Sequence, residues 1–387
     1  MKLNREMKTI EKHDIYLVVC SIIVSILLLM IPSGNDATFQ KVHRTSATVL
    51  EVNNSLVKAI GPVIEGTQQL RIELDRGPFK GERIDTDNIL LGKKELDKIF
   101  IPGDKALVVL DLESDGSDII YANVIDHYRT QKSILLIILF FLTLLLVAGW
   151  IGFKAIISFI FTGIIILKLL LPAFLMGLNP ILVAFALVTI LTAVIIFLVG
   201  GVSKKGLTAF CGAFAGVLST VLLSFGCTGW FQLNGANSPF LETLLYAGYG
   251  NLDLAGIFIA GIFVSSSGAV MDLAMDIAAA MHEIKENHPS ITTGALIRSG
   301  LTVGRHAVGT MTTTLLLAYS GGYTGMLMTF MAKGVPFENV LNMVYVSSEL
   351  VHTFVGSFGL VLVAPFTALL GGLILTGSPS TLSKIDE

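Results

Sequence analysis

An almost unbroken apolar stretch from Ser133 to Val202 constrains this chain more than any other feature. Only Lys154, Lys168 and the turn "LMGLNP" interrupt it. A helix of about 20 apolar residues crosses the bilayer core, so a stretch of this length needs about three spans. The expected spans are 133–151, 154–173 and 180–200. The chain is 53% hydrophobic and 14% charged, whereas soluble domains carry roughly 25% charged residues. The sequence therefore predicts a polytopic membrane protein.

Further apolar segments raise the expected number of spans to about eight. The first of them, Ile15–Ile31, follows a basic N-terminal segment and precedes "PSGNDATFQ", which offers no A-x-A-like cleavage site. We therefore expect an uncleaved anchor rather than a signal peptide. The remaining candidates are 206–226 and three spans that begin near Leu254, His306 and Leu350.

The distribution of Lys and Arg in the short loops predicts the orientation of these spans. With a cytoplasmic N-terminus, the inner loops hold Lys154, Lys204, Lys205, Lys285, Arg298 and Arg305. The outer short loops 174–179 and 227–251 hold no Lys or Arg, and the last outer loop holds Lys333. Because basic loop residues mark the cytoplasmic side, both termini are expected to be cytoplasmic.

Residues 36–131, between the first two spans, differ in kind from the rest. The segments "SATVLEV", "QQLRIEL", "KALVVLDL" and "DIIYANVI" alternate with the period of two that is typical of strands. They predict a small extracytoplasmic β-barrel or sandwich of about five or six strands. The run "DTDN" (Asp85–Asn88) has two interpretations, a cation site and, favoured here, a solvated turn. The segment has no cluster of basic residues, so no nucleic-acid partner is expected.

Three acids interrupt the sixth predicted span, in "SSSGAVMDLAMDIAAAMHEI". Asp272, Asp276 and Glu283 fall within about 40° of one another on a helical wheel, so they form one stripe. A straight helix from Leu254 to Ile284 is roughly 46 Å long, against about 30 Å of hydrocarbon. Either Asp272 lies at the inner boundary, which is the favoured interpretation, or the span breaks. The hinge candidates for a break are Ser265, Ser266, Ser267 and Gly268.

The seventh predicted span supplies side chains that could face this stripe. Arg305 and His306 begin it at the cytoplasmic level of Asp272 and Asp276, so an Arg–Asp pair is one hypothesis. The alternative is that Arg305 extends to lipid headgroups. Thr310 and Thr313 belong to a face of small and hydroxyl-bearing residues that suits helix packing as well as a polar path.

The eighth predicted span carries Glu349 and His352. An i, i+3 Glu/His pair is one possible half of a metal site, and the sequence offers no second half, so metal binding stays open. If the span begins near Leu350, both residues lie at the outer surface, about a membrane thickness from Asp272. The chain has no HExxH, GxSxG or phosphate-cradling loop. We therefore expect no catalytic residue, no cofactor and no enzyme activity.

Three motifs, "GAVMDLAMDIAAAMHEI", "GRHAVGTMTTTLLLAY" and "VGSFGLVLVAPFTALL", resemble those of the YibE/F-like family of bacterial membrane proteins. The resemblance runs from about Ala47 to about Leu375 and implies a multi-pass architecture in a bacterial cytoplasmic membrane. Asp272 and Arg305 match positions of the family's motifs. His306 stands where the family pattern has an acid, His352 where it has Arg, and Asp276 where a small polar residue is common.

The prediction is thus a polytopic α-helical membrane protein with one outer all-β domain between its first two spans. Its expected parts are 1–35 with the first span, the β domain 36–131, the seven-helix domain 132–376 and a cytoplasmic tail 377–387. The favoured function is permease-like transport of a small solute or ion, with Asp272 and Arg305 at a gate or coupling site. The rival is a non-transporting envelope protein whose outer β domain binds a protein partner. Apart from that partner only the lipid bilayer is expected to contact the chain, and the sequence indicates neither substrate nor oligomeric state.

Overall fold

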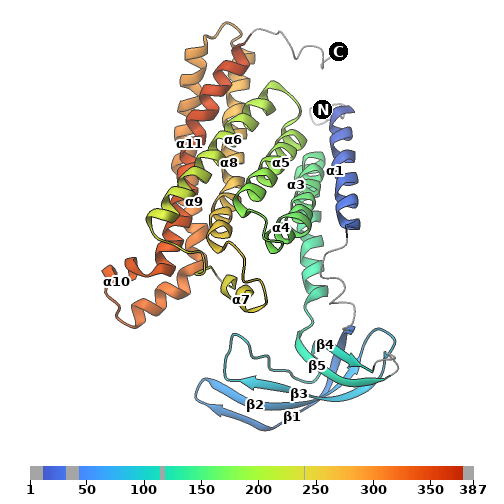
Figure 1. The fold of residues 1–387 in the computed structure, drawn as a ribbon. Helices are drawn as coiled ribbons and strands as arrows, with labels where there is room; N and C mark the ends of the chain where they lie inside the picture. The colour runs from blue at the N-terminus through green and yellow to red at the C-terminus, as the bar shows by residue number, and fades with distance from the viewer. Residues whose placement is uncertain (1–11, 32–42, 114–117, 239, 378–387) are drawn as a thin grey trace. The chain divides into compact units, whose positions relative to one another are not determined.

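The computed structural model (Figure 1) describes residues 12–31, 43–113, 118–238 and 240–377. The chain forms two compact units. The first, here called the helical unit, comprises Met1–Ile31 and Val147–Glu387, and the second, the β unit, comprises Pro32–Leu146. The sequence-based tail 377–387 lies outside the described residues except for Gly377.

The β unit is a five-stranded antiparallel sheet with the strand order β3-β2-β1-β4-β5. Its strands are β1 (His43–Ile60), β2 (Val63–Leu74), β3 (Arg83–Leu91), β4 (Lys105–Leu112) and β5 (Ile119–His127). The two outer strands approach each other, because the Thr86 hydroxyl on β3 donates to the carbonyl of Ala122 on β5. The sheet is therefore a partly closed barrel, and the small β domain predicted from the alternating segments is confirmed. The interpretation of Asp85–Asn88 as a turn is wrong, since these residues lie within β3.

The interior of the β unit contains a buried polar network as well as aliphatic side chains. Gln68 is 1% exposed, and its amide oxygen accepts from the backbone N–H of Phe100 and from the Asn88 side chain, both at 3.0 Å. Its amide nitrogen donates to Asn54 Oδ1 and to the carbonyl of Phe100. Because the buried polar groups of the network have partners, their hydrogen bonds offset the desolvation cost of burial and fix the 92–104 segment against β2.

The stability of the β unit is expected to depend on the ionised form of Asp75. Burial raises the pKa of its carboxyl, but hydrogen bonds from Lys105 and Thr48 outweigh burial and the pKa is lowered overall. A lowered folded-state pKa contributes stability above the ordinary value of about 3.9, and this is lost as the pH falls through the folded-state pKa. We predict that Asp75→Asn lowers protection of β1 and β4 amides from hydrogen exchange at pH 7 and that the deficit shrinks below about pH 4. A deficit of equal size at both pH values would contradict this assignment.

The helical unit consists of long helices joined by short connections. The elements are α1 (Lys12–Met30), α3 (Thr130–Ile165), the π-helix η1 (Ile166–Leu170), α4 (Leu171–Leu175), α5 (Pro180–Gly200), α6 (Lys204–Trp230), α7 (Leu241–Tyr246), α8 (Leu254–Asn287), α9 (Thr293–Ala332), α10 (Phe337–Asn342) and α11 (Val344–Thr376). The first part of α3 belongs to the β unit, which ends at Leu146.

Among the described residues, five helices are long and apolar enough to cross a membrane. They are Thr130–Leu175, Pro180–Gly200, Lys204–Trp230, Leu254–Asn287 and Val344–Thr376. The predicted spans 133–151 and 154–173 are not separated by a loop, because the chain stays helical apart from a non-helical kink at Gly149 (φ 53°, ψ −126°).

Lys168, on η1, donates a hydrogen bond to the carbonyl of Ile31, just beyond α1. A cation at the C-terminal end of a helix is electrostatically favourable.

Helix α6 packs closely on α11 through small residues at every fourth position. Its buried stripe consists of Thr208, Gly212, Gly216, Thr220, Ser224 and Thr228. A Cβ on Gly216 would lie 2.9 Å from Val363 Cβ, and one on Gly371 would lie 2.8 Å from Thr208 Cγ2. The two helices are thus antiparallel and nearly in backbone contact, the arrangement that small residues permit in membrane helix bundles.

Candidate functional site

Helix α8 has one exposed face, and this face carries polar or small residues from one end of the helix to the other. Large apolar side chains such as Phe263 and Ile277 are fully buried on the opposite side. We call the exposed face the polar stripe; its members are Gly261, Ser265, Gly268, Asp272, Asp276, Ala279 and Glu283. The stripe extends over roughly 33 Å of helix. The predicted alignment of the three acids on one face is therefore part of a longer pattern.

The hinge candidates Ser265–Gly268 do not interrupt α8, which is helical from Leu254 to Asn287. The three serine hydroxyls donate to carbonyls one turn earlier, at Ile262, Phe263 and Val264. Such bonds keep a serine hydroxyl satisfied inside a helix. The alternative of a broken span is therefore wrong. The position of Asp272 at the inner boundary of the membrane stays a prediction.

Ser265 is also the centre of a hydrogen-bonded cluster that joins three helices. Its hydroxyl lies 2.8 Å from Nε2 of His352 on α11. It accepts a hydrogen bond of 3.3 Å from the hydroxyl of Tyr319 on α9. The rings of Tyr319 and His352 lie 4.8 Å apart. The Ser265 hydroxyl has one proton to donate. When it donates this proton to the Ile262 carbonyl, it accepts a hydrogen bond from His352 Nε2. We call these three residues the Ser–His–Tyr cluster.

A glycine creates the space that the cluster needs. A Cβ on Gly356, one turn after His352, would lie 3.2 Å from Ser266 Cβ and 3.6 Å from the Tyr319 hydroxyl. The close approach of α11 to α8 at this level therefore leaves little room for a side chain at position 356. The sequence pattern did not single out Tyr319, which is one aromatic residue in a span of Leu, Ala and Gly.

Glu349 and His352 lie within α11 rather than at its start, because this helix begins at Val344 instead of near Leu350. Their predicted distance of a membrane thickness from Asp272 is wrong. His352 contacts Ser265, and Asp272 follows Ser265 by seven residues, or roughly 10 Å along α8. The cluster and the acidic part of the polar stripe are therefore neighbouring features of one surface.

The structure does not form the predicted Arg305–Asp272 pair. Arg305 is exposed on α9 and has no ion-pair partner among the described residues, and the same is true of Asp272 and Asp276. His306 is also exposed, with Nδ1 2.9 Å from the carbonyl of Thr302. The exposed face of α9 further includes Thr310, whose hydroxyl donates to the Ala307 carbonyl, and Thr313.

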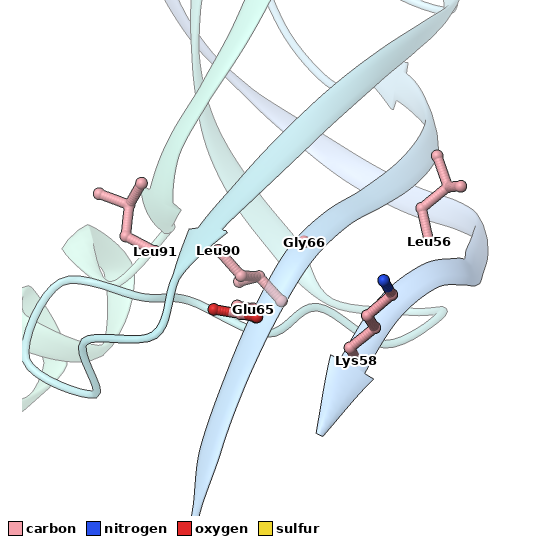
Figure 2. A pocket seen from close by; sticks show the side chains of 6 residues that line it. All are labelled: Leu56, Lys58, Glu65, Gly66, Leu90 and Leu91. Carbon is pink, nitrogen blue, oxygen red and sulfur yellow. The ribbon is translucent and has the colours of Figure 1, made fainter. Parts of the chain in front are cut away.

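Two further observations on the described residues bear on ligand binding. No group of three or more His, Cys, Asp and Glu side chains there is arranged to hold a metal ion. On the β unit, Figure 2 shows a shallow pocket lined by Leu56, Lys58, Glu65, Gly66, Leu90 and Leu91. Leu56 and Leu91 are 55% and 64% exposed, so this part of the barrel presents apolar side chains to its surroundings.

Comparison with known proteins gives one family and no individual relative. The sequence model of YibE/F-like proteins matches residues 136–377, which include every residue of the polar stripe and of the Ser–His–Tyr cluster. No curated protein and no solved structure matches the chain.

Proposed function

Because the chain belongs to the YibE/F-like family and has helices that suit a membrane, we propose that its helical unit transports a small solute or ion. The observation that supports transport is the polar stripe of α8. Carboxylates that face hydrocarbon are costly, so intramembrane acids line a protein interior or an aqueous path. A helix whose only open face consists of Gly, Ala, Ser, Asp and Glu is suited to line such a path.

The proposed placement puts the Ser–His–Tyr cluster near the centre of the bilayer. Ser265 lies eleven residues from the start of α8 at Leu254, or roughly 16 Å along the helix. This is about half of a hydrocarbon core of about 30 Å. In this placement the two parts of Thr130–Leu175 on either side of the Gly149 kink each cross the membrane. With α1, α5, α6, α8, the less apolar α9 and α11 they give eight crossings, so both termini are cytoplasmic. Glu283 then lies in or beyond the inner headgroup region, and Asp272 lies between it and the cluster.

In this proposal the two parts of the site have different roles. Asp272 and Asp276 supply negative charge that attracts cations or cationic groups into the path. The Ser–His–Tyr cluster offers hydroxyl and imidazole groups at its middle, where Glu349 is one helical turn from His352. The proposal assigns no catalytic step to any of these groups.

Removal of one charge tests this function. We predict that Asp272→Asn, in protein reconstituted into lipid vesicles, reduces flux of the transported species by tenfold or more, because an interaction with a charged group is worth about 1.5–3 kcal/mol. The assay would screen radiolabelled inorganic cations and small cationic organic solutes against protein-free vesicles. Glu242→Gln, an exposed change on α7 outside the stripe, is the matched control.

Three outcomes count against transport. These are wild-type vesicles that move none of the screened species faster than protein-free vesicles, an Asp272→Asn variant with undiminished flux, and an equal loss in Glu242→Gln. Thermal unfolding of each variant in detergent separates loss of flux from loss of folding.

The second candidate function, binding of an envelope partner, is favoured by the exposed apolar side chains of the β unit. Leu91, which lines the pocket of Figure 2, follows Ile89 by two residues on the same face of β3, and Ile89 is 67% exposed. Ile60, the last residue of β1, is 61% exposed. Large apolar side chains that gather on a surface commonly mark a site of interaction. Deletion of residues 36–131 distinguishes the candidates, because a partner-binding role must vanish while a self-contained permease retains flux.

A further inference from the structure

The polar stripe and Arg305 lie on the same side of the helical unit. On α9, Tyr319 points to Ser265 of the stripe. Arg305 precedes Tyr319 by fourteen residues, which places the two side chains within about 40° of each other around α9. On α8, Asp272 and Ser265 are within about 20° of each other by the same reasoning. One surface therefore carries acids on α8 and a cation on α9.

The acids and the cation also lie at the same level along the helices. A Cβ on Gly304 would lie 3.1 Å from Ile277 Cδ1, so the residue beside Arg305 packs against the residue beside Asp276. In the described residues these opposite charges nevertheless have no ion-pair partner, although all three side chains are exposed. Unpaired charges of opposite sign at one level give a surface that is electrostatically complementary to a second copy of itself.

We propose that a second copy of this chain packs on this surface, with Asp272 and Asp276 of each copy facing Arg305 of the other. Most protein oligomers are symmetric dimers in which one surface meets itself. A two-fold axis along the membrane normal keeps every residue at its own depth, so the acids of one copy meet the cation of its partner at the same level. The acids on α8 of each copy then face Arg305 on α9 of the other copy, so the dimer contains two such sets of paired charges.

Open glycines support close contact between the two copies. A Cβ on Gly261, Gly268 or Gly309 would meet no atom within 4 Å, although each of these residues lies in a long helix and is exposed. Exposed glycines let helix backbones approach each other across a membrane interface. The path lined by the polar stripe then runs between the two copies. The inference rests on the proposed membrane placement of α8, whereas its test does not require that transport occurs.

Charge reversal tests the pairing. We expect wild-type protein in lipid nanodiscs and in detergent to be dimeric by native mass spectrometry and light scattering. Arg305→Glu should weaken the dimer at least about tenfold, and the double change Asp276→Arg with Arg305→Glu should restore it. Lys333→Glu, an exposed reversal at the far end of α9, should leave the dimer unchanged.

Cross-linking gives a second test that does not depend on reversing a charge. Two differently tagged chains, one with Asp276→Cys and one with Arg305→Cys, should form a disulfide-linked pair when they are produced together. Each variant produced alone should cross-link no more than wild type, which carries Cys20, Cys211 and Cys227. A wild-type monomer at every concentration, a dimer insensitive to Arg305→Glu, or no mixed cross-link would each overturn the proposal. A monomer that still transports would leave the proposed function intact.

Discussion

Replacement of Gly212 by leucine is expected to prevent the helical unit from folding. A Cβ at this position would overlap the Thr367 hydroxyl and lie 2.8 Å from Thr367 Cβ and 2.9 Å from Thr367 Cα, so the side chain would collide with the backbone of α11 as well as with a side chain. The collision occurs within the stripe that joins α6 to α11, where Thr208, Thr220 and Ser224 are also fully buried. Overpacking that only shifts side chains costs about 1–3 kcal/mol, and we expect a larger loss because two helices must separate.

The matched control is Gly226→Leu, which adds the same side chain to the same helix. A Cβ on Gly226 would meet no atom within 4 Å, and the residue is exposed. We expect this variant to show wild-type yield and a wild-type thermal transition in detergent, while Gly212→Leu yields aggregated protein. Equal behaviour of the two variants would show that the contact between α6 and α11 is not essential for the fold.

Replacement of Gly268 by leucine is expected to abolish flux without loss of stability. Gly268 lies in the polar stripe between Ser265 and Asp272, and a Cβ there would meet no atom within 4 Å. Leucine also has a higher helix propensity than glycine, by roughly 0.8 kcal/mol per residue. The new side chain therefore places an isobutyl group in the proposed path at no cost to the helix. We predict a flux indistinguishable from protein-free vesicles, measured on the species that wild type transports.

Two comparisons make this result specific. Gly226→Leu adds the same group to an exposed site outside the stripe and should transport normally. Gly268→Ala adds only a methyl group and should retain most of the flux. A Gly268→Leu variant that folds and transports like wild type would exclude the stripe as the path.

The fold was predictable wherever apolar residues recur with the period of the helix or strand that they belong to. Strands β1, β2, β4 and β5 were predicted because apolar side chains alternate along them. Strand β3 was not, because the buried members of its alternation include Thr86 and Asn88, which are satisfied by hydrogen bonds instead of by apolar surroundings. A hydropathy pattern does not distinguish such a strand from a polar turn.

Only the part of the candidate site that lies on a single helix was predictable from the sequence. The three acids of α8 share a face because of helical geometry alone, and the sequence contains that information. The Ser–His–Tyr cluster joins residues that are 54 and 87 positions apart, so it depends on how α8, α9 and α11 pack. The predicted Arg305–Asp272 pair failed for the same reason, because agreement in level along two helices does not ensure contact within one chain.

Cysteine scanning of α8 tests the central claim most directly, because it measures water access and needs no knowledge of the substrate. In a background without Cys20, Cys211 and Cys227, single cysteines are introduced at positions 258–283 and treated with a membrane-impermeant thiol reagent in vesicles. We expect labelling at Gly261, Ser265, Gly268, Asp272 and Asp276, with protection of the intervening buried positions. Protection at every position between Gly261 and Asp276, or labelling without helical period, would contradict an aqueous path along this helix.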